Sequence, residues 1–321
     1  MANVATTTPS VADGNSPSAP PVVRQPAHTK RRLIQVGFLV PAIAYLTLYF
    51  GYPIITNFMM ASQEYTLQTI LTGTTPWVGL DNYQTAVTDP VFRTALLNTF
   101  LFTIASIIGQ FVLGLAIALF FNRKFALSGF LRSLILLPWL IPMIAASAVW
   151  GWILDADNGI LNQALELLPF VDSGPLWLTS TSMALVAVIL VNIWLGIPFN
   201  MTILYGGLQE IPEELYEAGA LDGATGWRAF WNITWPLLRP VVTVVLLLGV
   251  VYTLKVLDVI LGLTKGGPAH ASETLATLSY FTSFTGNRDF GVGAAYGNIL
   301  IVIALVFAVI YLRANRRAVD E

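Results

Sequence analysis

Residues 208–240 read LQEIPEELYEAGALDGATGWRAFWNITWPLLRP, a polar segment that separates two long apolar stretches. Pro212 suits the first position of a helix. Glu213 and Glu214 suit its first turn, because carboxylates stabilise the positive end of the helix dipole. Gly223 can end this helix in a left-handed conformation. The segment therefore predicts a short helix at about residues 211–223, placed between two apolar stretches.

The spacing within this segment also predicts distinct faces. Helical periodicity places four apolar residues on one stripe, namely Leu208, Ile211, Leu215 and Ala218. It places four glutamates on one acidic face, namely Glu210, Glu213, Glu214 and Glu217. Thr225 can cap a second short helix, and Pro236 is expected to terminate it. Four residues share one face of this helix, namely Trp227, Phe230, Trp231 and Thr234. One interpretation is a helix pair lying on lipid headgroups, but an anionic membrane surface favours Lys and Arg on the polar face. An acidic face instead favours a protein partner.

The composition indicates an integral membrane protein. The 321 residues are 55% hydrophobic and 11% charged, with a mean hydropathy of +0.70, whereas soluble domains carry roughly 25% charged residues. This excludes a soluble enzyme, and a net charge of −2 leaves no basic groove for nucleic acid. No cysteine is present, so disulfides and thiolate metal sites are excluded. His28 and His270 are too distant in sequence to suggest a zinc site, and no metal is expected.

Six apolar stretches predict an all-α, polytopic fold with six transmembrane helices. Each reaches or approaches the roughly 20 residues that cross a hydrocarbon core, and they cover about 33–58, 97–121, 131–154, 183–207, 238–262 and 294–312. A transmembrane barrel would show alternating segments of about ten residues. Helices are therefore the expected spanning form, because lipid offers no partner for unpaired backbone groups.

The parts of the chain outside these stretches complete the predicted organisation. Residues 1–30 are rich in Pro, Ser, Thr and Ala and predict a disordered tail without the basic start and apolar core of a signal peptide. Residues 31–93 should hold the first helix and an outer loop, 94–315 a five-helix core with the loop 208–237, and 316–321 a second tail. Twelve of the sixteen Lys and Arg residues then fall on one side, three on the other, and Lys255 inside the fifth stretch. This bias places both termini and the 208–237 loop in the cytoplasm.

The 208–240 segment resembles the EAA motif of ABC-importer permeases. That motif reads Glu-Ala-Ala, three residues, Gly, nine residues, Ile, one residue and Leu-Pro, and its spacing is matched here by Glu217, Ala218, Gly219, Gly223, Ile233, Trp235 and Pro236. Two positions depart from the motif. Gly219 replaces the second Ala and keeps a small side chain, and Trp235 replaces Leu and keeps an apolar one.

Other segments resemble the carbohydrate-uptake branch of these permeases, the maltose and glycerol-3-phosphate type. They are VGLDNYQTAVTDPVFRTALLNTFLFT at 78–103, LPWLIP at 137–142, WGWILDADNGILN at 150–162 and LTKGGPAHASETL at 263–275. The resemblance covers about residues 33–315 and implies the type-1 transmembrane fold of ABC importers. It also implies the membrane location, the cytoplasmic (inner) membrane of a prokaryote, where the chain contacts lipid and binds no nucleic acid.

The resemblance further implies a set of partners and a mechanism. Two homologous permeases pair in the membrane on a cytoplasmic ATPase dimer, and an extracytoplasmic solute-binding protein delivers a sugar, or a related polyol or glycerol phosphate. The helix at about 211–223 would dock on the ATPase through Glu217, Ala218, Gly219, Asp222 and Gly223. The chain has no GxxxxGK[ST] phosphate loop. It is therefore expected to be non-catalytic and without a cofactor, with ATP and Mg²⁺ bound by the partner ATPase.

Polar residues within the apolar stretches are candidates for the substrate path. The residues selected are Trp139, Asn192, Trp194, Asn200, Lys255 and Asp258. Trp139 and Trp194 lie beside prolines, where a broken helix can expose backbone to a cavity. Lys255 and Asp258 are three residues apart and can pair on one helix face. The alternatives are that Lys255 reaches the outer interface, that the pair is structural, and that the amides only bond neighbouring helices.

A second functional class is an ion-coupled secondary transporter of a small polar solute. Such a transporter should show inverted repeats and buried carboxylates. Asp258 is the sole acidic residue well inside an apolar stretch, and the two halves of the sequence show no convincing repeat. A membrane-embedded hydrolase needs a nucleophile–base or metal set, but neither histidine lies inside an apolar stretch. The importer permease is therefore the preferred interpretation.

Overall fold

The computed structural model describes residues 28–123, 125–169, 171, 173–286 and 288–319. Nearly all of these residues are helical, and between them they form no strand beyond two isolated bridges, Gln63–Trp77 and Thr66–Asp289. The helices are α1 (His28–Leu46), η1 (Thr47–Gly51), α2 (Tyr52–Met60), α3 (Leu67–Thr72), α4 (Asp81–Thr88), α5 (Phe92–Phe121), α6 (Ser128–Ile135), α7 (Leu137–Leu140), α8 (Met143–Ile153), α9 (Ile160–Glu166), α10 (Ala184–Gln209), α11 (Glu213–Leu221), α12 (Trp227–Ala229), η2 (Phe230–Thr234), α13 (Trp235–Leu254), α14 (Asp258–Leu263), α15 (Leu275–Phe284) and α16 (Phe290–Val319). The all-α prediction is confirmed.

The chain divides into two units, residues 1–54 and 55–321. In the first unit, α1, η1 and the start of α2 form a helical segment in which no residue from 37 to 54 is buried. The predicted tail at 1–30 falls mostly on residues 1–27, which lie outside the described part of the chain. Residues 28–30 already belong to α1, so the helix begins earlier than predicted.

Two π-turns, η1 and η2, each stand just before an aromatic–proline pair. Tyr52 donates its backbone N–H to the Thr47 carbonyl, and Trp235 donates its own to Phe230, so both bonds reach back five residues. Proline follows in each case, at Pro53 and Pro236. Because proline has no N–H and its ring crowds the preceding turn, a local π-turn lets the helix continue through it.

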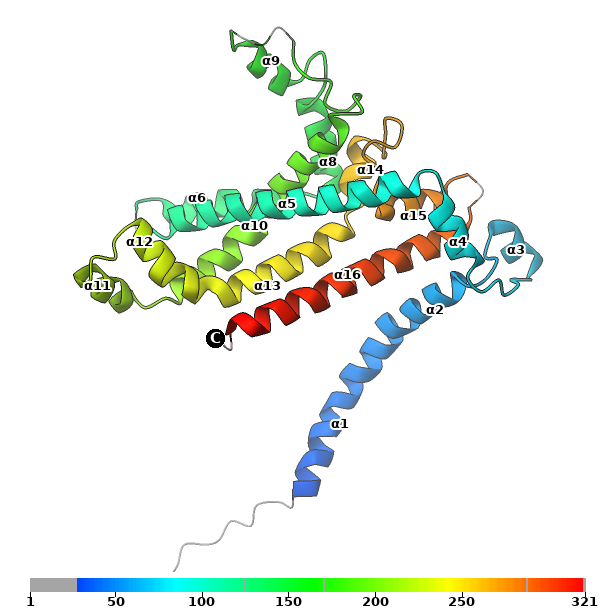
Figure 1. Cartoon of the computed structure of the whole chain (residues 1–321), viewed down its shortest axis with the longest axis horizontal. Helices are drawn as coiled ribbons and strands as arrows, with labels where there is room; N and C mark the ends of the chain where they lie inside the picture. The colour runs from blue at the N-terminus through cyan, green and yellow to red at the C-terminus, as the bar shows by residue number, and fades with distance from the viewer. Residues whose placement is uncertain (1–27, 124, 170, 172, 287, 320–321) are drawn as a thin grey trace, which may run out of the picture. The chain divides into compact units, whose positions relative to one another are not determined.

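Four long helices of the second unit, α5, α10, α13 and α16, lie side by side in that unit (Figure 1). The α5–α10 pair packs most closely because small residues alternate across the contact. A Cβ added at Gly109 would lie 2.4 Å from the end of the Ile193 side chain, and one at Gly114 would lie 2.6 Å from the Asn200 Cβ. Small residues let helix backbones approach within a membrane, where dispersion contacts and hydrogen bonds hold helices together.

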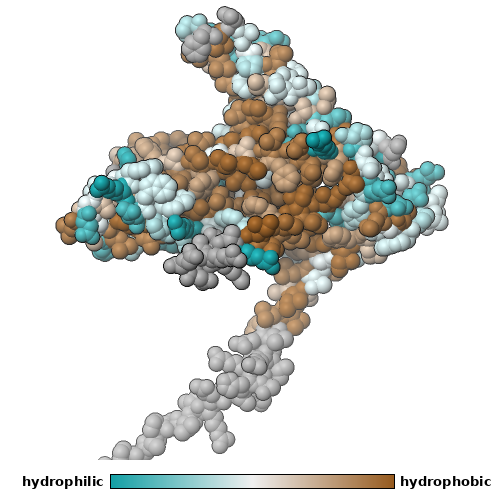
Figure 2. Space-filling view, in the orientation of Figure 1, coloured by the Kyte–Doolittle hydropathy of each residue, from teal (hydrophilic) through white to brown (hydrophobic). Residues whose placement is uncertain are grey.

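The polarity of α5 is inverted relative to a helix of a soluble protein. Its buried face carries amide and hydroxyl groups, those of Asn98, Thr99, Thr103, Ser106 and Gln110, whereas its exposed face carries Leu97, Leu101, Ile104 and Ile108. Figure 2 shows apolar side chains across the middle of the second unit on the visible face, with polar residues gathered toward its two ends. An apolar band of this kind fits the hydrocarbon region of a bilayer.

Five described helices are long and apolar enough to span a membrane, which is compatible with the six predicted. They cover Gly37–Met60, Phe92–Phe121, Ala184–Gln209, Trp227–Leu254 and Phe290–Arg313. The stretch predicted as one helix at 131–154 is instead divided into α6, α7 and α8. Ile141 is extended, with φ −86° and ψ 128°, because the residue before a proline, here Pro142, is pushed out of the helical region. The prediction of one continuous helix here was wrong.

The fifth predicted helix, at 238–262, also breaks. The helix that begins at Trp227 runs through Pro236 and ends at Leu254, and α14 restarts at Asp258. Residues 255–257 contain no proline or glycine, so the sequence carried no local signal for this break. At the other end of the chain, α16 continues to Val319 and includes residues 316–319, which were predicted to be a tail.

Candidate functional site

The EAA-like segment forms an exposed corner at one end of the second unit, the same end at which α16 finishes (Figure 1). Its first helix, α11, starts after Pro212, which serves as the N-cap, and is followed by Gly223 at φ +78°. Ala224 donates its N–H to the Gly219 carbonyl at 2.8 Å, and Gly223 donates to Ala220 at 3.1 Å. These two bonds form a Schellman motif, so the predicted left-handed end of the helix is confirmed.

One side of α11 packs against η2. The Tyr216 hydroxyl lies 2.9 Å from the Thr234 hydroxyl. A Cβ added at Gly219 would lie 2.6 Å from Cδ1 of Ile233, so the residue that departs from the Ala of the motif packs against η2. The glycine thus allows Ile233 to lie directly on the helix.

The other side of α11 is exposed. Glu217, Ala218, Asp222 and Gly223 are all exposed, and Gly219 is partly buried against η2. Leu221, which the sequence reasoning did not select, is 91% exposed at the end of the helix. The predicted apolar stripe is wrong in part, because Leu208 belongs to α10 and is buried, whereas Leu215 on α11 is exposed. An apolar residue two positions before the helix-ending Gly223 was the available signal for Leu221.

The second half of the segment differs from the prediction. Gly226, at φ +53°, and not Thr225, is the N-cap of α12. The helix does not stop at Pro236, because the π-turn η2 carries it into α13. The ring of Trp227 stacks on Phe230 at 5.4 Å between centroids and meets Trp231 edge-on at 5.6 Å. The predicted shared aromatic face is therefore present, but it lies on the start of a long helix.

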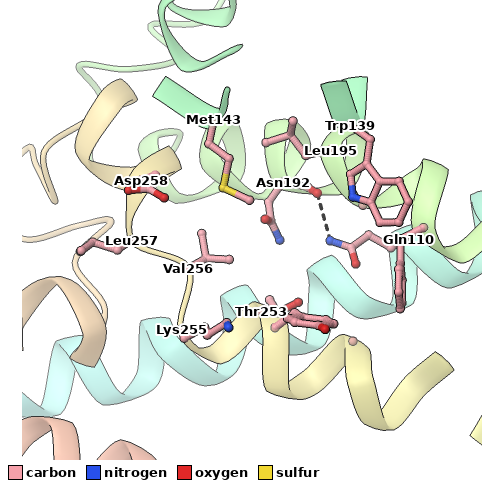
Figure 3. A pocket seen from close by; sticks show the side chains of 14 residues that line it. Gln110, Trp139, Met143, Asn192, Leu195, Thr253, Lys255, Val256, Leu257 and Asp258 are labelled. Carbon is pink, nitrogen blue, oxygen red and sulfur yellow. Dashed lines mark hydrogen bonds between the residues drawn. The ribbon is translucent and has the colours of Figure 1, made fainter. Parts of the chain in front are cut away.

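A cavity of about 560 Å³ lies within the second unit, where the helix breaks at 141–142 and 255–257 leave space between α5, α7, α8, α10 and α13. Its lining residues are Gln110, Trp139, Met143, Asn192, Leu195, Gly196, Phe199, Gly249, Tyr252, Thr253, Lys255, Val256, Leu257 and Asp258 (Figure 3). Pockets of this size accommodate small organic ligands. Four of the six residues selected from the sequence, Trp139, Asn192, Lys255 and Asp258, line the cavity.

Aromatic rings form one wall of this cavity. Trp139 of α7 lies 5.9 Å from Phe199 of α10, and Phe199 lies 5.9 Å from Tyr252 of α13, both distances between ring centroids. Phe199 and Tyr252 were not selected from the sequence. The other aromatic residues of α10 and α13 pack against neighbouring side chains. Only the folded chain therefore shows that Phe199 and Tyr252 line the cavity.

A hydrogen bond between α5 and α10 forms another part of the lining, beside Trp139 in Figure 3. Gln110 of α5 donates from Nε2 to the backbone carbonyl of Asn192 at 2.9 Å. A Cβ added at Gly196 would lie 2.2 Å from Cδ of Gln110, so this glycine makes the approach possible. Asn192 is 5% exposed, and within the described chain its Nδ2 has no hydrogen-bond partner. Figure 3 shows this amide nitrogen directed into the cavity.

The predicted Lys255–Asp258 pair is not formed. The break at 255–257 removes the shared helix face on which the pair depended. Neither side chain takes part in an ion pair among the described residues. The Lys255 ammonium instead lies over the ring of Tyr252, 5.0 Å from its centroid. Both charges therefore line the cavity separately, and both are exposed at its open side.

Trp194 and Asn200 do not line the cavity. Trp194 packs edge-on against Trp150 at 5.5 Å between centroids, within an apolar cluster. Asn200 is buried and donates from Nδ2 to the Gly196 carbonyl at 3.0 Å. The helix break expected near Trp194 is absent, because α10 continues through Pro198.

Two further amides tie the helices together at the end of the unit opposite α11. Asn98 donates from Nδ2 to the carbonyls of His270, Ala271 and Glu273 at 3.2, 3.1 and 2.9 Å. Asn298 accepts from Asn57 at 2.7 Å and donates to the Tyr83 hydroxyl at 2.9 Å. Asn98 therefore ties α5 to the loop before α15, and Asn298 bonds neighbouring helices, as one of the sequence interpretations allowed.

An apolar helical bundle that encloses a part-polar cavity, with an exposed helix between two spans, defines a polytopic membrane transport protein. Residues 110–320 match the family of binding-protein-dependent transport system inner membrane components, and the chain belongs to this family. The predicted class is thereby confirmed, and the ion-coupled transporter alternative is not supported.

Two relatives are named as permease proteins of transport systems, and one solved structure shares the fold. The chain is 34% identical over 241 residues to the trehalose/maltose transport system permease protein MalF of Thermococcus litoralis, covering 75% of this chain and 80% of the relative. It is 32% identical over 291 residues to the sulfoquinovosyl glycerol transport system permease protein SmoG of Agrobacterium fabrum, covering 89% and 91%. The fold matches a chain of a bacterial ABC transporter involved in the import of the acidic polysaccharide alginate, with a TM-score of 0.76, 24% identity and coverage of 90% and 96%.

Proposed function

We propose that this chain is one of two homologous permease subunits of an ATP-driven importer that moves a sugar, or a related polyol or glycerol phosphate, across the cytoplasmic membrane of a prokaryote. The observation that carries this proposal is the cavity, which combines aromatic rings with amides inside an apolar bundle. Aromatic faces stack on the apolar faces of sugar rings, and amides bond hydroxyl groups. The names of the two relatives, which concern trehalose, maltose and sulfoquinovosyl glycerol, support a sugar.

In the proposed importer, α11 is the helix that couples the permease to the ATPase. Its exposed carboxylates, the Schellman end at Gly223 and the exposed Leu221 suit docking into a groove on a cytoplasmic ATPase. ATP and Mg²⁺ would be bound by that ATPase dimer, and this chain would be non-catalytic. The Lys and Arg bias supports a cytoplasmic location for α11, for both termini and for the end of α16.

The substrate path in this proposal is the cavity closed by a second permease. Lys255 and Asp258 are exposed at its open side, whereas Asn192 and Thr253 are buried in its floor. A charged side chain inside a membrane requires water, ligand or a partner, so the open side is where a second subunit would stand. An extracytoplasmic binding protein would deliver the sugar to the opposite end of the bundle from α11.

The first test is purification of the tagged chain from its native membrane in a gentle detergent, followed by uptake in vesicles. Recovery of a second permease and an ATPase, with uptake that requires ATP, is the expected result. A chain that purifies alone and transports a solute without ATP would overturn the proposal. In that case the Asp258→Asn variant should abolish an ion-coupled uptake, since Asp258 is the carboxylate that lines the cavity.

A further inference from the structure

The cavity contains a cation that the chain itself does not neutralise. Lys255 stands at the break between α13 and α14, and no carboxylate pairs with it among the described residues. Its contact is the face of Tyr252, 5.0 Å from the ring centroid. A ring face attracts an ammonium group. It does not replace the oxygen acceptors that the three N–H donors of lysine require.

A second donor is directed into the same space. Asn192 Nδ2 is buried and has no partner in the described part of the chain. In Figure 3 the Asn192 amide and the Lys255 ammonium approach the cavity from opposite walls, on α10 and on the segment that follows α13. Leaving a buried donor unpaired costs free energy. The buried Asn192 amide and the exposed Lys255 ammonium face one cavity, and together they indicate a ligand rich in acceptor oxygens.

The remaining residues that line the cavity include aromatic rings and one carboxylate. Trp139, Phe199 and Tyr252 supply the aromatic wall. Asp258, which lies away from Lys255 at the start of α14, supplies a carboxylate that can accept from hydroxyl groups. The cavity therefore offers separate places for a ring face, for hydroxyl groups and for one negative group.

We propose that Lys255 and Asn192 bind an anionic group of the transported sugar, so that the substrate class is an acidic saccharide carrying a carboxylate, sulfonate or phosphate ester. This inference rests on the proposed function and names the substrate class of the same cavity. Charge-assisted hydrogen bonds to such a group are the strong ones, and the two donors on opposite walls would fix its position. The competing role for Lys255 is an ion pair with a carboxylate of the second permease, which would affect assembly and not selection.

The experiment uses the whole importer reconstituted in vesicles with its binding protein. The probes are a glucuronate-containing disaccharide and a neutral disaccharide of the same linkage, each presented as a saturating, preloaded complex with the binding protein. Wild type should take up the acidic disaccharide faster. A binding protein that loads the neutral disaccharide alone, or equal uptake of the two, would overturn the inference.

Three variants separate binding from assembly. Lys255→Gln should slow uptake of the acidic disaccharide about tenfold or more, because a charge-assisted bond is lost, and should leave the neutral one unchanged. Lys255→Arg should retain most of the acidic uptake. Lys265→Gln, the same kind of substitution at an exposed lysine outside the cavity, is the matched control, in which the preference should persist. An equal loss of both uptakes in Lys255→Gln, or loss of the second permease on purification, would contradict substrate binding.

These outcomes are distinguishable from failure of the proposed function. If the importer is not a sugar permease, neither disaccharide is taken up in the presence of ATP, even though the complex is assembled. If the function holds and only the inference fails, ATP-dependent uptake of a disaccharide is observed, but the wild type shows no preference for the acidic one.

Discussion

The α11 corner and the cavity present their chemistry in opposite ways. On α11, side chains such as Glu217 and Leu221 project outward from one short helix whose backbone is held by a Schellman motif. In the cavity, side chains converge inward from six helices and the segment 255–257, and their positions depend on glycines such as Gly196. The corner should therefore tolerate changes of exposed side chains but not of backbone conformation, whereas the cavity should be sensitive to one added methyl group.

The largest effect is expected from Gly223→Leu. The position has φ +78° and open space around it, so the cost is conformational, roughly 1–2 kcal/mol for a residue other than glycine. Loss of the left-handed helix end should lower the amount of ATPase that co-purifies with the chain, and it should lower ATP-dependent uptake, each about tenfold or more. Membrane insertion should be retained. Gly223→Asn is the control, because Asn tolerates this conformation. Normal uptake by the Leu variant would remove α11 as the docking element.

The next effect, on the stability of the complex and less on uptake, is expected from Gly196→Ala. The added Cβ would lie 2.2 Å from Gln110 Cδ and displace the bond from Gln110 to Asn192. Overpacking should cost about 1–3 kcal/mol of stability, measured as a lower melting temperature of the purified complex. Gly206→Ala on the same helix meets nothing within 4 Å and should be neutral. The double variant with Gln110→Ala should recover stability. If it does not, the clash with Gln110 is not the cause.

An intermediate effect is expected from Glu217→Lys. The side chain is exposed, so the fold should be unchanged. If α11 docks on the ATPase, reversal of one interface charge should reduce uptake about threefold, in the range of exposed charge pairs, and more at low salt. Glu210→Lys, just outside α11, is the matched control. Equal effects of the two variants would indicate a general field effect and not a contact of α11.

The smallest effect is expected from Gly219→Ala, which restores the Ala of the EAA motif. The added Cβ would meet only the end of the flexible Ile233 side chain, 2.6 Å away. The required shift of Ile233 should largely offset the gain in helix propensity of about 1 kcal/mol. Uptake should stay within about twofold of wild type, since both effects are of that order. A loss as large as that of Gly223→Leu would show that packing on η2, and not the helix end, limits coupling.

The α11 corner was largely predictable because its signals are local. Pro212, two glutamates in the first turn and Gly223 act through neighbouring backbone groups, and the structure confirms a helix with a left-handed end. The prediction was wrong where a proline did not act as a stop. The helix continues through Pro236 into α13 because the π-turn η2 precedes this proline. A helix can accommodate a proline when the preceding turn is wider.

The cavity was predictable only in part. Trp139, Asn192, Lys255 and Asp258 were selected from their residue types and all line it, although their role in transport stays a prediction. The sequence did not indicate the break at 255–257, the separation of Lys255 from Asp258, or the part taken by Phe199 and Tyr252. Each of these depends on which helices pack against one another, and no neighbouring residue signals it.

Composition and the lengths of the apolar runs were enough to specify a helical membrane bundle, because lipid leaves no other way to satisfy the backbone. Proline, glycine and charge positions were enough to specify the α11 corner, because caps and turns are decided within a few residues. The folded chain alone decided where α13 ends, which glycines allow α5 and α10 to meet, and which polar groups face the cavity. Those features depend on contacts between residues far apart in sequence. Such contacts contribute free energy only once the helices have packed.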